Sequence, residues 1–180
     1  LKSVSGGTHV TIAWVVLIIL LLILIPIALA GISFAPWVPT WQSDIDRALR
    51  LAAVKPGETV YDLGCGNGKV VFAAAKLGAN AVGIEIAWPF YVWCQVSKLI
   101  RRASLAHFKL GNLFKADLRN VDVVYVFGMP DNIKHKLSKK LLAELKPGSR
   151  VVSYAFHIPG LPNEYKDKPP GKMSVFLYSL

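Results

Sequence analysis

The sequence predicts an α/β domain built on a mostly parallel sheet and preceded by one transmembrane helix. Two observations support this prediction. From residue 43 onward, short β-rich runs alternate with helical segments, which is typical of parallel strands joined by crossover helices. Ahead of them, residues 10–31 carry no charged side chain. The first pattern predicts the fold of the domain, and the second predicts how the domain is attached to a membrane.

The apolar stretch Val10–Gly31 is long enough to cross a bilayer. As a helix rising ~1.5 Å per residue it reaches ~33 Å, against a hydrocarbon core of ~30 Å. A cleavable signal peptide is the alternative, but its apolar region is only ~7–15 residues long. We expect a tail over 1–9, a transmembrane helix over 10–31, a linker over 32–42 and the folded domain over 43–180. Arg47 and Arg50 follow the span, so the positive-inside rule favours a cytoplasmic domain.

The elements of the domain are expected in a regular order. The first is a helix with Ser43 as its N-cap, stopped by Lys55-Pro56-Gly57. Strands are expected at Thr59–Leu63, Asn80–Ile86, Ala106–Leu113, Val121–Phe127, Arg150–Phe156 and Met173–Leu180, and helices at Lys69–Lys76, Phe90–Ala103 and Asn132–Leu145. Residues 157–172 are rich in Pro and Gly and are expected to form a loop.

The charge of the chain favours a membrane surface as its partner. The net charge is +10, and Lys2 is the one charged residue ahead of the domain, so the part after the apolar stretch carries +9. This suits a domain held near anionic headgroups. The basic residues are not interleaved with aromatic ones as in single-strand binders, which argues against nucleic acid. Cys65 and Cys94 lack metal-type spacing, and no metal site is expected.

The loop Asp62-Leu63-Gly64-Cys65-Gly66-Asn67-Gly68 lies between the first strand and a helix, where open α/β sheets bind ligands. Its glycines permit a sharp turn and the close approach of a ligand. A dinucleotide loop requires G-x-G-x-x-G, but here the third glycine comes one residue early and Lys69 takes its place. An acid directly ahead of G-x-G-x-G is typical of methyltransferases that use S-adenosylmethionine. We therefore expect cofactor contacts from Asp62, Gly64, Cys65, Gly66 and Gly68.

Two further strand ends supply expected cofactor contacts. Glu85 ends the second strand, where a carboxylate can accept hydrogen bonds from both ribose hydroxyls, and Ile86 follows it. Asn112 lies near the end of the third strand, and its amide can both donate to and accept from an adenine edge. Leu113 is expected to cover the adenine ring.

After the fourth strand the chain reads Phe127-Gly128-Met129-Pro130-Asp131. The Asp-Pro-Pro-Tyr type motif of the base-amino methyltransferases is absent here, which argues against DNA adenine methylation. The candidate substrate entrance instead consists of Thr40, Phe127, Met129, Pro130 and Phe156. An apolar, aromatic entrance lowers the pKa of an amine acceptor without a dedicated base, so no general base is assigned.

These residues together resemble a known family. Asp62–Lys69, Val82–Glu85, Leu110–Lys115, Val124–Pro130 and Leu137–Leu145 resemble the ATP synthase c-subunit and adenine nucleotide translocase lysine methyltransferases and their prokaryotic relatives. The Trp-Val-Pro-Thr segment at 37–40 resembles the family's Tyr-Val-Pro-Thr. The resemblance covers about residues 34–162. It implies a Rossmann-like class I methyltransferase domain with an antiparallel last strand, S-adenosylmethionine as cofactor, and a lysine of a membrane or membrane-adjacent protein as acceptor.

The chain also departs from the family pattern. Asn67, Lys69 and Asn112 stand where the family usually has Asp, Arg and Asp, and Ala87-Trp88-Pro89 replaces an Asn-Pro-Trp stretch. The cofactor contacts tolerate these changes, whereas the acceptor is less strongly specified. A methyltransferase for small molecules or lipids, and a non-catalytic membrane module that binds S-adenosylmethionine, therefore stay open as alternatives.

Overall fold

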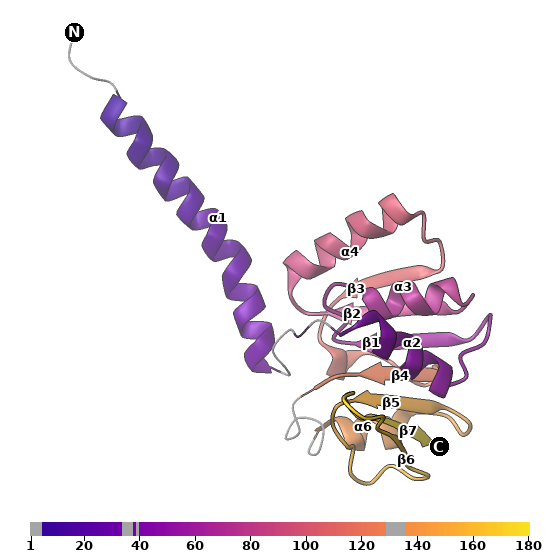
Figure 1. Cartoon of the computed structure of the whole chain (residues 1–180). Helices are drawn as coiled ribbons and strands as arrows, with labels where there is room; N and C mark the ends of the chain where they lie inside the picture. Colours follow the sequence, from indigo (N-terminus) through magenta and orange to yellow (C-terminus); the bar gives the residue numbers. More distant parts are fainter. Residues whose placement is uncertain (1–4, 34–37, 39, 129–135) are drawn as a thin grey trace.

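One sheet organises the domain in the computed structural model, which describes residues 5–33, 38, 40–128 and 136–180 (Figure 1). Its strands are β1 (Thr59–Leu63), β2 (Asn80–Glu85), β3 (Ala106–Leu110), β4 (Val123–Val126), β5 (Arg150–Tyr154), β6 (Tyr165–Asp167) and β7 (Val175–Ser179), in the spatial order β3-β2-β1-β4-β5-β7-β6. Strands β1 to β5 pair in parallel, while β7 runs antiparallel to β5 and β6 antiparallel to β7. The mostly parallel sheet with an antiparallel last strand is thus confirmed.

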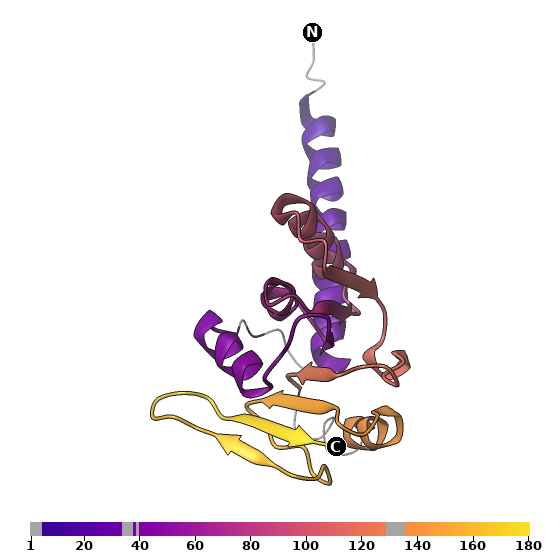
Figure 2. The ribbon, with the colours of Figure 1, turned by 90° about the vertical axis from the view of Figure 1, so that its right-hand side faces the viewer.

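Helices cover both faces of the sheet. Those of the domain are α2 (Gln42–Leu51), α3 (Lys69–Lys76), α4 (Trp88–Arg101) and α6 (Ser138–Glu144), with a short 3₁₀ turn, η1 (Leu113–Lys115). One core cluster joins Ile45 of α2, Val71 of α3 and Cys94 of α4 to the sheet, and the other joins Leu141 of α6 to Leu118. The two clusters lie on opposite faces, with α2 and α6 on opposite sides of the sheet in Figure 2.

The first helix stands apart from these layers. Helix α1 spans Ser5–Ser33, and its segment Thr11–Ile32 is long and apolar enough to cross a membrane, by length and composition. Most of its large apolar side chains from Ile12 to Leu29 are exposed. Figure 1 shows that α1 extends away from the domain and that only its C-terminal end approaches it, close to the start of α4.

Several element boundaries differ from the sequence-based expectation. Helix α2 begins at Gln42, with the Trp41 carbonyl accepting hydrogen bonds from the amides of Asp44 and Ile45, so the prediction of Ser43 as N-cap was wrong. The hydroxyl of Ser43 instead accepts a hydrogen bond from Lys172. The expected loop 157–172 contains the three-residue edge strand β6. Part of the helix expected over 132–145 falls outside the described residues.

A mostly buried arginine, Arg150, connects three of these elements at the end of the sheet remote from the glycine loop. Arg150, at the start of β5, donates hydrogen bonds to the carbonyls of Ala52 and Ala53 just after α2, and it forms an ion pair with Glu58 ahead of β1. Its side chain and that of Glu58 are mostly buried. Removal of the guanidinium would therefore leave polar groups unpaired in a region of low water content.

We expect Arg150→Met to lower the free energy of unfolding by about 1–3 kcal/mol, because buried acceptors lose a charged donor. Arg119→Met is the matched control, since Arg119 pairs with Asp117 on an exposed loop and should change stability little. Denaturant titration of the full chain in detergent, followed by near-ultraviolet circular dichroism, measures both. Equal effects of the two substitutions would contradict the role assigned to Arg150.

Candidate active site

A cavity of about 380 Å³ opens at the carboxyl ends of β1, β2, β3 and β4, between the sheet and the end of α1. The loop or turn that follows each of these four strands contributes to its wall. The lining includes all but one of the residues expected to bind a cofactor, namely Asp62, Gly64, Cys65, Gly66, Glu85, Ile86, Asn112 and Leu113. Gly68 lies behind this lining. The topology therefore brings together residues that are up to 51 positions apart in sequence.

The glycine loop follows β1 and approaches the cavity with its main chain. Gly64 has φ +93° and no atom within 4 Å of the position that a Cβ would take, so it leaves open space on the cavity side. Gly68 has φ +76°, and a Cβ there would meet the Phe108 ring at 2.8 Å. Residues other than glycine rarely adopt such φ values. Gly64 thus permits close approach of a ligand, whereas Gly68 permits α3 to pack closely on the sheet.

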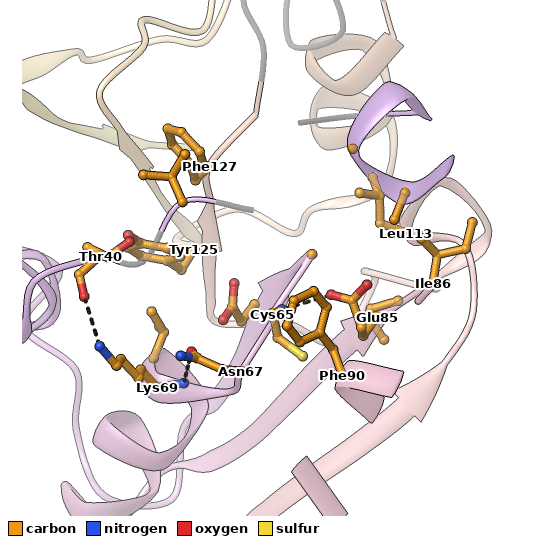
Figure 3. Close-up of a pocket in the computed structure, with 18 of the residues that line it drawn as sticks. Thr40, Cys65, Asn67, Lys69, Glu85, Ile86, Phe90, Leu113, Tyr125 and Phe127 are labelled. Atoms are coloured by element: carbon orange, nitrogen blue, oxygen red, sulfur yellow. Dashed lines mark hydrogen bonds between the residues drawn. The ribbon is translucent and has the colours of Figure 1, made fainter. Parts of the chain in front are cut away.

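Glu85 holds this loop in place from the end of β2. One carboxylate oxygen accepts a hydrogen bond from the amide of Gly66 and the other from the amide of Ala87, each at 2.8 Å. The carboxylate is buried, and Figure 3 shows it beside the glycine loop. Each oxygen retains a further lone pair for a ligand hydroxyl. The expected ribose acceptor therefore also fixes the backbone that surrounds the cofactor.

Asp62 is the second buried carboxyl group of the cavity. Burial, and secondly the nearby charge of Glu85, raise the pKa of Asp62 to about 8. A carboxyl group in this position is stabilised in its charged form by a cation. The pair of buried acids therefore favours a ligand that carries positive charge, as S-adenosylmethionine does.

The thiol of Cys65 has a structural rather than a ligand-facing position. A hydrogen bond with Cys94, together with burial, raises the pKa of the Cys65 thiol well above its usual range. Cys94 in turn donates to the carbonyl of Gly66 at 3.2 Å. The Cys65 side chain packs so closely on Gly83 that a Cβ there would lie 2.6 Å from the sulfur. Only the backbone of Cys65 is therefore suited to contact a cofactor.

The turn after β3 closes the cavity from the side of the expected adenine. The side-chain oxygen of Asn112 accepts a hydrogen bond from the amide of Phe114 at 2.9 Å and caps η1. Its amide nitrogen is consequently the group suited to an adenine edge. Leu113 is buried, and Figure 3 shows Leu113 and Ile86 close together at the end of α1.

The expected substrate entrance is brought together only in part. Thr40 and Phe127 line the cavity, and the Phe127 ring packs against Tyr154 and Phe156 at centroid distances of 5.9 and 6.1 Å. Phe156 is not among the residues that line the cavity and backs the Phe127 ring instead. Met129 and Pro130 lie outside the described residues.

Several lining residues were missed from the sequence. Tyr125 of β4 has its hydroxyl beside Thr40, and burial raises its pKa above the usual range for tyrosine (Figure 3). Phe90 of α4 lies across the cavity from it. Alternation along β4 could have identified Tyr125, since it shares a face with Phe127. No pattern in the sequence indicates that Ile27, Ala30 and Gly31 of α1 line the cavity.

The described residues contain no group of three or more His, Cys, Asp or Glu side chains that could hold a metal ion. His157, after β5, is hydrogen-bonded to Glu164 and is not among the cavity-lining residues.

The sheet order and the two buried acids around a glycine loop define a class I methyltransferase that uses S-adenosylmethionine. The chain belongs to the family of the ANTKMT methyltransferase domain, whose model matches residues 62–165. A protein-lysine N-methyltransferase of Saccharolobus islandicus is 36% identical over 82% of this chain and 94% of its own length. The ATP synthase c-subunit lysine N-methyltransferase of Mus musculus is 34% identical over 69% of this chain, which spans 50% of that relative.

A solved structure shows the same architecture with a cofactor product bound. The RNA methyltransferase of Salinibacter ruber, in complex with S-adenosyl-L-homocysteine, superimposes with a TM-score of 0.71 and 33% identity, covering 79% of this chain and 93% of that one. The expectation of S-adenosylmethionine as cofactor is thereby confirmed, while the individual contacts from this chain stay predictions.

We expect the advantage of wild type over Asp62→Asn in S-adenosylmethionine affinity to increase with pH. The pKa of about 8 means that Asp62 is mostly protonated at pH 6 and mostly ionised at pH 9, and only the ionised form attracts the ammonium group. The two proteins should bind similarly at pH 6, while wild type should bind about 10–100-fold more tightly at pH 9, the factor for ~1.5–3 kcal/mol of a charge-assisted hydrogen bond.

Calorimetric titration of both full-length proteins from pH 6 to pH 9 measures this ratio. A ratio that does not change with pH would show that the Asp62 carboxylate does not contact the cation.

Proposed function

We propose that the chain is a membrane-anchored protein-lysine N-methyltransferase whose acceptor lies at the membrane surface. The relatives from Saccharolobus islandicus and Mus musculus support a lysine acceptor, since both are named as lysine N-methyltransferases of proteins. The observation that carries the proposal is the shared wall of the cavity. Ile27, Ala30 and Gly31 of α1 line the same space as the glycine loop.

This shared wall relates the active site to the bilayer. If the Thr11–Ile32 segment of α1 crosses a membrane, the cavity lies next to the point where the helix leaves the hydrocarbon core. Arg47 and Arg50 follow in α2, which favours a cytoplasmic position for the domain. An acceptor on a neighbouring membrane protein would then reach the cavity by diffusion in two dimensions.

The residues of the cavity fit transfer to an amine. When bound, S-adenosylmethionine supplies an electrophilic methyl group on a sulfonium centre. Asp62 and Glu85 would orient the cofactor, and Phe127 would form the wall along which the acceptor enters. An unperturbed lysine has a pKa of about 10.4, so the amine must lose its proton before it attacks. Partial burial against Phe127 favours the neutral amine, and correct placement then provides most of the acceleration.

A direct test combines purified full-length protein, labelled S-adenosylmethionine and membranes from cells that lack the protein. We expect protease-sensitive, ribonuclease-resistant label, identified by mass spectrometry as methyl-lysine in a membrane protein. The double substitution Asp62→Asn with Glu85→Gln is the control, because it removes both acids from the cavity and should abolish the label.

The alternatives predict different products in the same assay. Label confined to the lipid extract would favour a lipid methyltransferase, and label lost on ribonuclease treatment would favour RNA, the substrate named for the Salinibacter ruber structure. Binding of the cofactor with no label in any fraction would favour a non-catalytic module. Each of these outcomes contradicts the lysine proposal.

We further expect Phe127→Ala to raise the pH at which lysine methylation reaches half of its maximum rate. Loss of the aromatic wall exposes the acceptor amine to water, which raises its pKa toward the unperturbed value. At neutral pH, kcat/KM for the acceptor should fall about tenfold, equivalent to ~1.4 kcal/mol, with little change in cofactor affinity. Phe127→Leu keeps an apolar wall and should shift the profile less. A pH profile that is unchanged in Phe127→Ala would exclude this role.

A further inference from the structure

Helix α4 carries an apolar surface on the side that faces away from the sheet. The residues of this outward face are Trp88, Val92, Trp93, Val96, Leu99 and Ile100. Trp93 is 60% exposed, and Leu99 and Ile100 are 76% and 78% exposed. The buried residues of the same helix are the small Cys94 and Ser97. An ordinary surface helix shows the reverse distribution, and contiguous exposed apolar residues of this kind indicate a binding surface.

The charges around the outward face of α4 favour an anionic lipid surface as its partner. No acidic residue occurs between Glu85 and Asp117, whereas that interval contains five Lys and Arg residues. Lys98, Arg101 and Arg102 lie at the C-terminal end of α4, next to the apolar stripe. Helices that lie in a membrane interface combine bulky apolar residues with flanking Lys and Arg in this way, and tryptophan is enriched at that depth.

The position of α4 relative to α1 supports the same partner. Residues of the last turns of α1 and Phe90 in the first turn of α4 line one cavity, so the two helices meet at that point. Figures 1 and 2 both show α4 at the edge of the domain beside α1, with the sheet on its inner side. The outward face of α4 therefore looks toward the side to which α1 extends. A bilayer crossed by α1 would lie against this face.

We propose that α4 is an interfacial helix whose outward face lies in the headgroup region of an anionic bilayer, next to the membrane-spanning α1. This inference rests on the anchoring role of α1 in the proposed function and adds a second contact. One spanning helix alone does not fix the tilt of the domain relative to the bilayer. A second contact through α4 fixes the orientation of the cavity, because Phe90 of the same helix lines it.

Site-directed spin labelling of the full chain in vesicles of phosphatidylcholine and phosphatidylglycerol tests this inference. Nitroxide labels are attached to Leu99→Cys on α4, Leu20→Cys on α1 and Leu142→Cys on α6. Leu142 is the matched control, since it is an exposed leucine (49%) on the opposite face of the sheet. The unsubstituted chain, whose two cysteines are buried, provides the background.

We expect the label at Leu99 to collide more with oxygen than with a water-soluble nickel complex, like the label at Leu20 and opposite to the label at Leu142. A label at Leu99 that behaves like Leu142 would overturn the inference, and so would shielding from both reagents, which would indicate a protein partner or a second copy of this chain. The label at Leu20 reports separately on whether α1 lies in the bilayer. Because the measurement requires no methyl transfer, it distinguishes failure of this inference from failure of the proposed function.

A charge substitution provides an independent check. Leu99→Glu with Ile100→Glu places two carboxylates on the outward face and should move a label at Val96→Cys from lipid into water when the vesicles contain phosphatidylglycerol. Leu142→Glu should have no such effect. Neither change touches the cavity lining, so unchanged S-adenosylmethionine affinity verifies that the fold is intact. A Val96 label that stays in lipid after the double substitution would contradict the proposed contact.

Discussion

The carboxylate of Glu85 joins the loop after β1 to the turn after β2, because its two oxygens accept hydrogen bonds from the amides of Gly66 and Ala87. Hydrogen bonds to an ionised acceptor are about twice as strong as neutral ones, so this carboxylate fixes the backbone that a ligand must approach. The charge of Glu85 also lies close to Asp62 and contributes, after burial, to the raised pKa of Asp62. The same arrangement therefore shapes the cavity and makes it favourable for a cationic ligand.

Local patterns in the sequence identified the parallel sheet and most of this cavity. Strands such as β4 are apolar on both faces, and the ends of parallel strands must meet at one edge, so the glycine loop, Glu85 and Asn112 could be grouped from the order of the elements alone. What the sequence missed depends on contacts between distant segments. The edge strand β6 pairs with β7, Phe156 backs Phe127 rather than lining the cavity, and the α1 wall arises from packing.

The exposed face of α4 shows the same limit of sequence patterns. Its sequence is amphipathic enough to predict a helix, yet the pattern alone does not say which side faces the sheet. Tertiary packing decides this, since the small side chains of Cys94 and Ser97 permit close contact with β2 and β3 and direct the larger residues outward. Burial of apolar area contributes about 25 cal/mol per Å², so packing alone would favour the reverse orientation in water. A lipid surface removes this conflict.

In the proposed arrangement, the depth of the cavity relative to the bilayer would contribute to the choice of acceptor. Lysines of membrane proteins extend their apolar stems along the hydrocarbon and place the amine near the headgroups. A cavity held at that level by α1 and α4 would meet such amines preferentially, and the partial desolvation at its aromatic wall would favour their neutral form. Selection by depth requires few specific contacts with the acceptor sequence. This is consistent with a domain of only about 140 residues.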